Sequence, residues 1–322
     1  MDNIESVFRI LVFPGILFLA VFALLAEYVD RKLCARLQNR MGPPWFQPFA
    51  DFIKLVAKED MVPETADRKV FKFMPVLALA AAATAFLYIP VWGTKSPLGG
   101  FTGDLIVVLY LLTIPTITFF LGGWYSGSPY SLLGSARTIT QLFAYEVPLF
   151  LAVLAPAILA NGQAGVLPWS LGGMAAFYSG HPLLALVNLI GLCVALVALL
   201  GKLERVPFDI PEAETEIVGG TFTEYSGRLL ALFRLAIDIE TVVGASLLAA
   251  VFLPFGLDLP PVAVFVLYLV KVLAIVCVLA VLRTLFARLR IDQMIGFCWK
   301  VVAPIAFIQL LVNLVVKGTV LQ

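Results

Sequence analysis

The stretch VPFDIPEAETEIVGGTFTEYSG, from Val206 to Gly227, lies between two long apolar runs at 183–203 and 229–253. Each run has the length and composition of a membrane-spanning helix. The connection between them concentrates five carboxylates: Asp209, Glu212, Glu214, Glu216 and Glu224. Ionisable groups next to hydrocarbon are costly and tend to mark ion or substrate routes. The segment therefore indicates a helical membrane protein that handles protons or cations.

The composition extends this interpretation to the whole chain. Of its 322 residues, 61% are hydrophobic and only 13% are charged. Such values are typical of polytopic membrane proteins, and a net charge of +1 argues against a nucleic-acid-binding surface. We predict an all-α membrane protein, a helix bundle in lipid that forms a single transmembrane domain over residues 1–322. About eight spans of roughly 20 residues are expected, at 8–29, 73–92, 104–121, 139–160, 183–203, 229–253, 261–282 and 299–316.

The distribution of positive charge predicts the orientation. Lys and Arg are abundant in the first, third, fifth and seventh connections, whereas the opposite side carries only Arg9, Lys95 and Lys317. By the positive-inside rule, the odd-numbered connections face the cytoplasm and both termini lie outside. The acidic loop, at about 204–228, is then cytoplasmic. The first apolar run is long enough to remain as a span of a multi-pass plasma-membrane protein, so we expect no cleavable signal.

The cysteines are scattered, and His181 is the only histidine of the chain. The four cysteines are Cys34, Cys193, Cys277 and Cys298. Zinc or an iron–sulfur cluster needs several thiolates or imidazoles converging on one ion. The spacings offer no such grouping, so we expect neither a metal site nor a redox centre in this chain.

The first connection contains WFQPFADFIKLVAK, at about 45–58, behind the helix breaker Gly42-Pro43-Pro44. Its apolar residues fall on one helical stripe: Trp45, Phe49, Phe52, Ile53 and Val56. This pattern predicts an amphipathic helix along the cytoplasmic interface. The helix is a general interfacial anchor, a docking surface or the lid of a lateral cavity. As candidates for partner docking we select Arg36, Arg40, Trp45, Phe49, Asp51 and Lys54.

Several ionisable residues fall within predicted spans or at their ends. Glu146 lies about 10 Å into the fourth span at 1.5 Å per residue, and Pro148 weakens the helix beside it. A proton-relay role is the favoured interpretation of such a carboxyl. Glu27 ends the first span ahead of a basic girdle and is expected to face the bundle or the headgroups. Glu204 joins the fifth span to the acidic loop and is also a candidate.

In the sixth span, Arg234 and Asp238 are four residues apart and hence on one helix face, where they could form a desolvated ion pair. Such a pair is either structural or a place where Asp238 exchanges Arg234 for a proton. Glu240 points about 200° away from Asp238. Lys271, near the middle of the seventh span, needs a wet cavity or a counter-charge, for which Asp238 and Glu240 are the candidates.

Two prolines, Pro207 and Pro211, forbid a regular helix at the start of the acidic segment, so the chain must turn there. Glu212 and Glu216 could then share one face of a short helix, with Glu214 on the opposite face. Crowded carboxylates raise one another's pKa values and favour a shared proton. The alternative is a solvated acidic loop, but the interleaved VPF, IVGG and TF favour a segment folded against the protein.

Four motifs resemble those of a known family. They are DRK and RMGP with QPFADFIKLVAKE, GWYSGSPYSLLGSARTITQLFAYE, VPFDIPEAETEIVGG with TEYSG, and RLRIDQMIGFCWKVVAP. The chain resembles, over nearly its whole length, the membrane subunit of respiratory complex I known as subunit one, and its relatives in energy-converting hydrogenases. Two departures, the short passage from GP to QP and Ile237 in place of a glutamate, make it look more like the membrane-bound hydrogenase or sulfane sulfur reductase branch.

The resemblance implies a non-catalytic subunit that joins a peripheral redox arm to a membrane arm. Its partners would be hydrogenase-like large and small subunits, with iron–sulfur clusters and in one case a nickel–iron centre, and antiporter-like membrane subunits. Carried over by position, the carboxylates of the charged axis are Glu146, Glu212, Glu214, Glu216, Glu224 and, more loosely, Asp238.

Three functions remain open. In the first, ferredoxin-driven hydrogen evolution or sulfane sulfur reduction in the peripheral arm drives H⁺ or Na⁺ translocation through a two-state element. The second is a quinone-binding subunit of an NADH or F420H2 dehydrogenase, which the short GP-to-QP passage disfavours. The third is a stand-alone ion transporter, which the whole-chain resemblance disfavours. The candidate residues for proton or ion coupling are Glu27, Glu146, Glu204, Asp209, Glu212, Glu214, Glu216, Glu224, Arg234, Asp238, Glu240 and Lys271.

Overall fold

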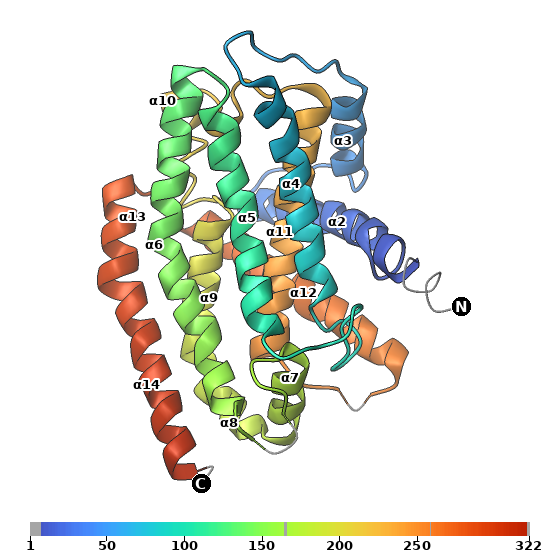
Figure 1. Cartoon of the computed structure of the whole chain (residues 1–322), viewed down its shortest axis with the longest axis vertical. Coiled ribbons are helices and arrows are strands. Elements are labelled where there is room, and N and C mark those ends of the chain that lie inside the picture. Colours follow the sequence, from blue (N-terminus) through green and yellow to red (C-terminus); the bar gives the residue numbers. More distant parts are fainter. Residues whose placement is uncertain (1–7, 164–165, 258, 321–322) are drawn as a thin grey trace.

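An elongated bundle of helices makes up the computed structural model, which describes residues 8–163, 166–257 and 259–320 (Figure 1). Among these residues, seven helices are long and apolar enough to cross a membrane, and one shorter apolar helix accompanies them. The predicted all-α membrane bundle is therefore confirmed.

The described helices, in chain order, alternate long spans with short connecting helices. Those of the first half are α2 (Ile16–Leu37), α3 (Gln47–Ala57), α4 (Arg68–Leu87), α5 (Asp104–Trp124), α6 (Pro129–Ala160), α7 (Leu171–Gly180) and α8 (Pro182–Val187). Those of the second half are α9 (Leu189–Lys202), α10 (Glu214–Ile217), the 3₁₀ turn η1 (Gly220–Phe222), α11 (Gly227–Phe252), α12 (Pro261–Leu285), α13 (Ile291–Phe297), the π-helical turn η2 (Cys298–Val302) and α14 (Ala303–Val320).

The fifth predicted span is not one helix, because the chain breaks at Asn188 between α8 and α9. With 14 residues, α9 is about 21 Å long, which is too short to cross a hydrocarbon core of about 30 Å by itself. The break lies at a polar residue whose side-chain amide donates to the Tyr178 hydroxyl at 3.1 Å. An apolar run therefore predicted the segment but not its bend.

The fourth span is longer than apolarity alone predicted, since α6 begins at Pro129 rather than near 139. Its additional turns carry Ser131, Ser135 and Thr138, and all three side chains are fully buried in the bundle. A search for apolar runs misses a helix whose polar face points inward. The last span is also longer than predicted, because α13, η2 and α14 form one continuous helical segment.

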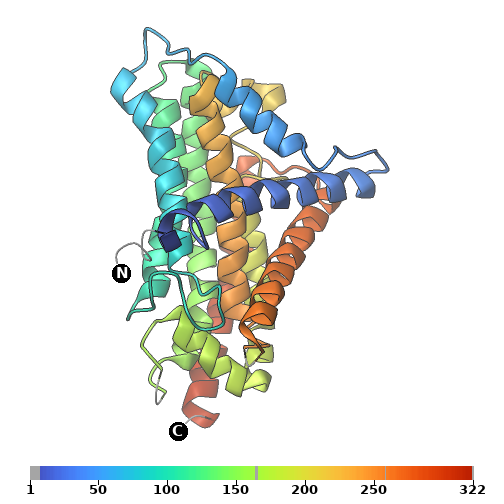
Figure 2. The ribbon, with the colours of Figure 1, turned by 90° about the vertical axis from the view of Figure 1, so that its right-hand side faces the viewer.

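The centre of the bundle is α11. In its most apolar window 78% of the residues are buried, compared with 33% for α12, and it packs against α2, α4 and α12. Figure 2 shows α2 and α12 inclined against the steeper α4, α6 and α11. The amphipathic helix predicted at 45–58 is α3, which packs against α2 and α11 and leaves Ile53 and Val56 exposed.

The acidic segment folds back against the bundle, as its interleaved apolar residues predicted. Phe208, Ile210 and Phe222 are at most 5% exposed. Tyr225 stacks on Phe71, with ring centroids 3.9 Å apart, and donates its hydroxyl to the Phe71 carbonyl at 3.2 Å. Burying one large apolar side chain stabilises a fold by about 1.5–3 kcal/mol. These residues therefore anchor the carboxylates that alternate with them.

Candidate functional site

A cavity of about 630 Å³, here called the chamber, lies between α2, α3, α11 and the connection that follows α9. Ligand pockets are usually lined mostly by apolar groups, but more than half of the residues lining the chamber are ionisable. They are seven carboxylates, Glu27, Asp51, Glu204, Asp209, Glu212, Asp238 and Glu240, and six basic side chains, Arg31, Lys202, Arg205, Arg234, Arg283 and Arg288.

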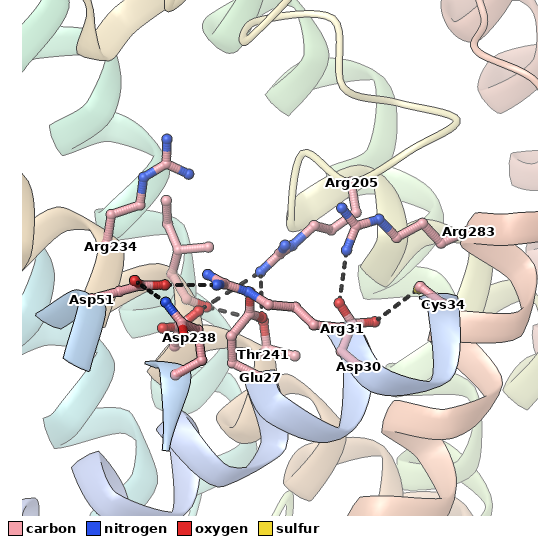
Figure 3. Close-up of polar contacts among 12 residues, drawn as sticks. Glu27, Asp30, Arg31, Cys34, Asp51, Arg205, Arg234, Asp238, Thr241 and Arg283 are labelled. Atoms are coloured by element: carbon pink, nitrogen blue, oxygen red, sulfur yellow. Dashed lines mark hydrogen bonds and ion pairs between the residues drawn. The ribbon is translucent and has the colours of Figure 1, made fainter. Parts of the chain in front are cut away.

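Glu27, on the chamber side of α2, is held between two guanidinium groups (Figure 3). Arg31 Nε lies 2.6 Å from Glu27 Oε1, and Arg205 Nη2 lies 3.1 Å from Glu27 Oε2. Arg31 also reaches Asp51 of α3 at 3.0 Å, and Gln47 donates to the same carboxylate at 2.8 Å. These contacts tie the amphipathic helix to the first span. Glu27 therefore faces the bundle, one of the two predicted orientations.

Arg205 is shared between carboxylates of two helices. Besides Glu27, its Nη2 lies 3.7 Å from Asp238 Oδ1 of α11. The Glu27 carboxylate raises the pKa of Arg205 well above its usual value, although burial opposes this shift. Arg205 therefore stays charged. It is placed to interact with either Glu27 or Asp238.

The ion pair predicted between Arg234 and Asp238 is replaced by two others. Arg234 Nη1 lies 3.6 Å from Glu212 Oε1, while Asp238 is paired with Arg205. The reason is that the connection after α9 folds over α11 and brings its own charges to both residues. Spacing along one helix could not reveal these partners.

The innermost charges of the chamber are Lys202 of α9 and Glu240 of α11. Their Nζ and Oε1 atoms are 2.8 Å apart, and both side chains are 1% exposed. Lys202 also donates to the Leu112 carbonyl and lies 5.8 Å from the centre of the Tyr145 ring. A buried pair of this kind is costly to break from one side, so each residue depends on the other for its counter-charge.

Glu204 differs from the other carboxylates of the chamber because it forms no ion pair within 4 Å among the described residues. Its side chain is buried, and Oε1 has no hydrogen-bond partner there. Burial raises the pKa of Glu204 well above its usual value, and the neighbouring charge of Glu212 raises it further. These surroundings favour the protonated form of Glu204, and a change of the charge around it can shift its protonation.

The carboxylates of the acidic segment are separated by arginines rather than crowded together. Asp209 pairs with Arg288 at 3.2 Å, and Glu216 pairs with Arg137 at 2.7 Å. A hydrogen bond from Arg137 lowers the pKa of the half-exposed Glu216, so the expectation that crowding raises the pKa was wrong for this residue. Glu224 is half-buried and is not part of the chamber lining. The side chain of Glu214 lies outside the described residues.

Two further coupling candidates lie apart from the chamber lining. Glu146 is half-buried on α6, one residue beyond Tyr145. Lys271 of α12 has neither predicted counter-charge: its ammonium donates to the carbonyls of Leu253 and Phe255 at 2.6 and 2.5 Å. It thus caps the end of α11, because carbonyls at a helix C-terminus lack intrahelical partners.

The docking candidates divide between surface and chamber. Arg36, Arg40, Trp45 and Lys54 are exposed, while Phe49 is half-buried. Asp51 lines the chamber and pairs with Arg31. Arg36 lies in the last turn of α2, and the other exposed members lie in α3 or in the passage before it; Figure 1 shows α3 in the same half of the bundle as α10.

Sequence reasoning missed Lys202 and Arg205, which it counted among the basic residues of the cytoplasmic side. Lys202 lies inside the apolar run 183–203, and the rule that intramembrane ionisable residues are functional would have selected it. Arg205 had no such signal, because its importance depends on the fold that brings Glu27 and Asp238 to it. Within the described ranges, no group of three or more His, Cys, Asp or Glu side chains is arranged to hold a metal ion.

Known proteins resemble this chain along most of its length. Residues 10–314 match the NADH dehydrogenase family. An NADH-quinone oxidoreductase subunit of Syntrophobacter fumaroxidans is 35% identical, over 99% of this chain and 98% of the relative. NADH-quinone oxidoreductase subunit 8 of Thermus thermophilus is 36% identical, over 89% of this chain and 80% of the relative.

A solved structure agrees with these sequence matches. A chain in the structure of the membrane-bound sulfane sulfur reductase, an archaeal respiratory membrane complex, superposes with a TM-score of 0.80 and 25% identity, and the match covers 97% of this chain and 99% of that one. The family inferred from the motifs is thereby confirmed. The chain belongs to the NADH dehydrogenase family and is a multi-pass membrane subunit of a complex I-like oxidoreductase.

Proposed function

We propose that this chain is the non-catalytic energy-coupling subunit of its complex, in which redox chemistry of a peripheral arm changes the protonation of the chamber carboxylates. The observation that carries the proposal is the chamber itself, where seven carboxylates and six basic groups meet around about 630 Å³. Charges in such a partly shielded place interact more strongly than in water. A change of charge in a neighbouring subunit can therefore shift a proton here.

Two features of the chamber supply the two-state behaviour that coupling requires. Arg205 lies closer to Glu27 than to Asp238, at 3.1 and 3.7 Å, so its charge can move between them with a small displacement. Burial and the neighbouring charge of Glu212 raise the pKa of Glu204 and so favour its protonated form. When Arg205 or an added charge stabilises the ionised form of a carboxylate, a proton is released, and the reverse change takes one up.

The proposal also assigns a side of the bundle to each class of partner. The peripheral arm, with iron–sulfur clusters and in a hydrogenase a nickel–iron centre, docks at the cytoplasmic end near the exposed Arg40, Trp45 and Lys54. Antiporter-like membrane subunits receive the coupled H⁺ or Na⁺ movement from the α6 side, where Glu146 is half-buried. Both termini lie on the extracytoplasmic side in this orientation. The likeness to a chain of the sulfane sulfur reductase complex favours a peripheral arm of that type, for which the motif resemblance implies ferredoxin as the electron donor.

The function is tested by replacing Glu204 with glutamine in the complete complex, reconstituted in proteoliposomes. Glu204→Gln keeps the shape of the side chain but removes its titratable proton. We therefore expect electron transfer without ion translocation, or arrest of both. The matched control is Glu64→Gln, which changes an exposed carboxylate of the first connection. Ion-to-electron ratios in Glu204→Gln equal to those of the control would refute the proposal.

Quinone binding is the second candidate, and one observation favours it. The chamber wall formed by α2, α3 and α5 includes Leu24, Phe52, Leu55 and Phe119, which suit an apolar ring or tail. The relatives named above are NADH-quinone oxidoreductases. Competition of a quinone-site inhibitor with the native electron acceptor would support this alternative, and insensitivity to quinones and such inhibitors would support the ferredoxin-linked arm.

A further inference from the structure

One face of α6 is polar, buried and outside the chamber lining. Its side chains recur at helical spacing: Ser131, Ser135, Thr138, Gln141 and Tyr145. Each is at most 1% exposed. At 1.5 Å per residue the first four extend over about 15 Å. A buried helix face in a membrane bundle is usually apolar, so this seam, as we call it, needs an explanation.

Hydrogen bonds within the protein satisfy the seam only in part. Ser135 and Thr138 donate to carbonyls one turn earlier, at 2.7 and 3.2 Å. Gln141 donates to the carbonyls of Gly201 and Phe208 at 2.7 and 2.8 Å. The hydroxyl oxygen of Ser131 and the amide oxygen Oε1 of Gln141 have no partner among the described residues. The donors of Ser135, Thr138 and Gln141 are thus taken up by backbone carbonyls, while the Ser131 hydroxyl, which can donate and accept, and the Gln141 acceptor are left without partners.

The cytoplasmic end of the seam is closed by η1. Thr221 is 0% exposed, and its hydroxyl also has no hydrogen-bond partner in the described part of the chain. Two glycines bring it there: a Cβ atom at Gly134 would lie 2.5 Å from Thr221 N, and one at Gly123 would lie 3.1 Å from Thr221 Cα and 3.2 Å from the Ser131 carbonyl. The backbone of Thr221 is therefore packed closely against α5 and α6, next to the turn of α6 that carries Ser131.

The inner end of the seam is Glu204. The Thr138 hydroxyl interacts with the Glu204 carboxyl, and Gln141, one turn further along, is bonded to the turn that carries Glu204 and Phe208. Glu204 Oε1 is the fourth unpartnered oxygen of this set. Buried polar groups are rarely left unsatisfied, since each lost hydrogen bond costs free energy. Two of the four oxygens are hydroxyls, which both donate and accept, so the set points to a common partner that can do both.

We propose that the seam binds a short file of water molecules that delivers protons from the cytoplasmic surface at η1 to Glu204, separately from the chamber. Water fits because it donates two hydrogen bonds and can bridge acceptors that do not reach one another. A proton arriving as hydronium forms an O–H bond on ionised Glu204 and leaves neutral water behind. The inference rests on the proposed function, because it names the route by which protons reach Glu204, the carboxylate assigned to coupling.

Two valine substitutions test the seam against an internal control. Thr138→Val and Thr221→Val keep the volume and remove the hydroxyl. Thr140→Val is the matched control, because Thr140 lies on the same helix, donates to the carbonyl four residues earlier at 2.7 Å and is only half-buried. In proteoliposomes of the complete complex we expect proton translocation to slow severalfold in both seam variants, with a larger solvent deuterium isotope effect, and to stay unchanged in Thr140→Val.

The outcomes separate this inference from the function on which it rests. Seam variants that match Thr140→Val, while Glu204→Gln abolishes coupling, would overturn the water file and leave the function standing. Restoration of Thr138→Val by added NaCl would mean that the acceptors hold Na⁺, which also overturns the proposal. If Thr221→Val fails to assemble, Ser131→Ala replaces it, because it removes a single oxygen from the same region. Ordered water between Thr221 and Glu204 in a high-resolution map of the complex would support the file, and side chains closed against each other would contradict it.

Discussion

The two ends of the bundle treat buried polar groups in opposite ways. At the end near the C-terminus, Asn188, Gln309 and Asn313 form a neutral cluster in which amides satisfy one another. Asn313 donates to Asn188 at 2.7 Å, and Gln309 donates to the Val187 carbonyl at 2.9 Å. At the other end, the chamber contains seven carboxylates, and Glu204 keeps a buried oxygen without a hydrogen-bond partner or an ion pair among the described residues.

Lysines show the same contrast. Lys271 and Lys317 donate to carbonyls at the ends of α11 and α6, at 2.5 to 3.0 Å, where a positive charge complements the helix dipole. Lys202 instead pairs with the buried Glu240. Fully satisfied polar networks make a fold rigid and specific, whereas incompletely satisfied ones retain groups that can change state. We infer that the neutral cluster of Asn188, Gln309 and Asn313 is structural and that the chamber carries the proton chemistry.

The largest effect is expected from breaking the innermost pair of the chamber. Lys202→Met leaves Glu240 buried without its counter-charge, which should lower the free energy of unfolding by about 3–5 kcal/mol. Denaturation of the purified complex, followed by loss of this subunit, measures the change. The double variant Lys202→Met/Glu240→Leu should regain most of it, and equal losses in the single and double variants would argue against a paired charge.

A smaller loss of stability, with no loss of coupling, is expected when the neutral cluster is broken. Asn313→Leu removes the donor to Asn188 and leaves buried acceptors unsatisfied, at a cost of about 1–3 kcal/mol. The number of ions translocated per electron should stay at the wild-type value, because no coupling group is touched. A changed number of ions per electron, in a variant that still assembles, would show that the neutral cluster also takes part in coupling.

The pH dependence of coupling should come from Glu204. Its pKa is raised, so the carboxyl is protonated below that pKa and loses its proton as the pH increases through it. Where Glu204 must be protonated, the coupled rate falls about tenfold per pH unit above the pKa, equivalent to about 1.4 kcal/mol per unit. Rate–pH profiles should show this alkaline limb in wild type and lack it in Glu204→Gln; an unchanged limb would assign it to another group.

The smallest effect is expected at the rim. Glu216 is half-exposed, and its pKa is lowered by Arg137, so it is ionised at neutral pH and its pairing is lost only on acidification. Exposed ion pairs contribute about 0–1 kcal/mol. Glu216→Gln should therefore change thermal stability at pH 7 very little and leave the ion-to-electron ratio intact. Loss of coupling in this variant would show that coupling depends on an exposed carboxylate rather than on those inside the chamber.

The sequence was sufficient to predict the parts of the fold that depend on local pattern. Apolar runs marked the spans, the helical stripe marked α3, and the interleaved apolar residues of the acidic segment predicted that it packs against the bundle. Patterns of this kind failed where burial was polar. The first turns of α6 were missed because Ser131, Ser135 and Thr138 face inward, and the break at Asn188 was missed because its amide is satisfied by Tyr178 from another helix.

The sequence could predict which kinds of residue form the candidate site. It could not predict which of them form ion pairs with one another. Most of the chamber carboxylates were selected from sequence, since charges near membrane depth are rare. Their partners come from other segments of the chain: Glu27 of α2 pairs with Arg205 of the connection after α9, and Glu240 of α11 pairs with Lys202 of α9. Such contacts depend on how the connection after α9 crosses α11, which no single segment encodes. For the same reason Lys271 was assigned a carboxylate and instead caps a helix.

The most direct test is an infrared difference spectrum of the complex between its oxidised and reduced states. A protonated carboxyl that changes on reduction gives a C=O band, and Glu204→Gln should remove that band while Glu64→Gln leaves it in place. The account predicts this loss, together with loss of ion translocation in the same preparation. Identical spectra in wild type and Glu204→Gln would show that the chamber carboxyl keeps its proton throughout turnover and would contradict the account.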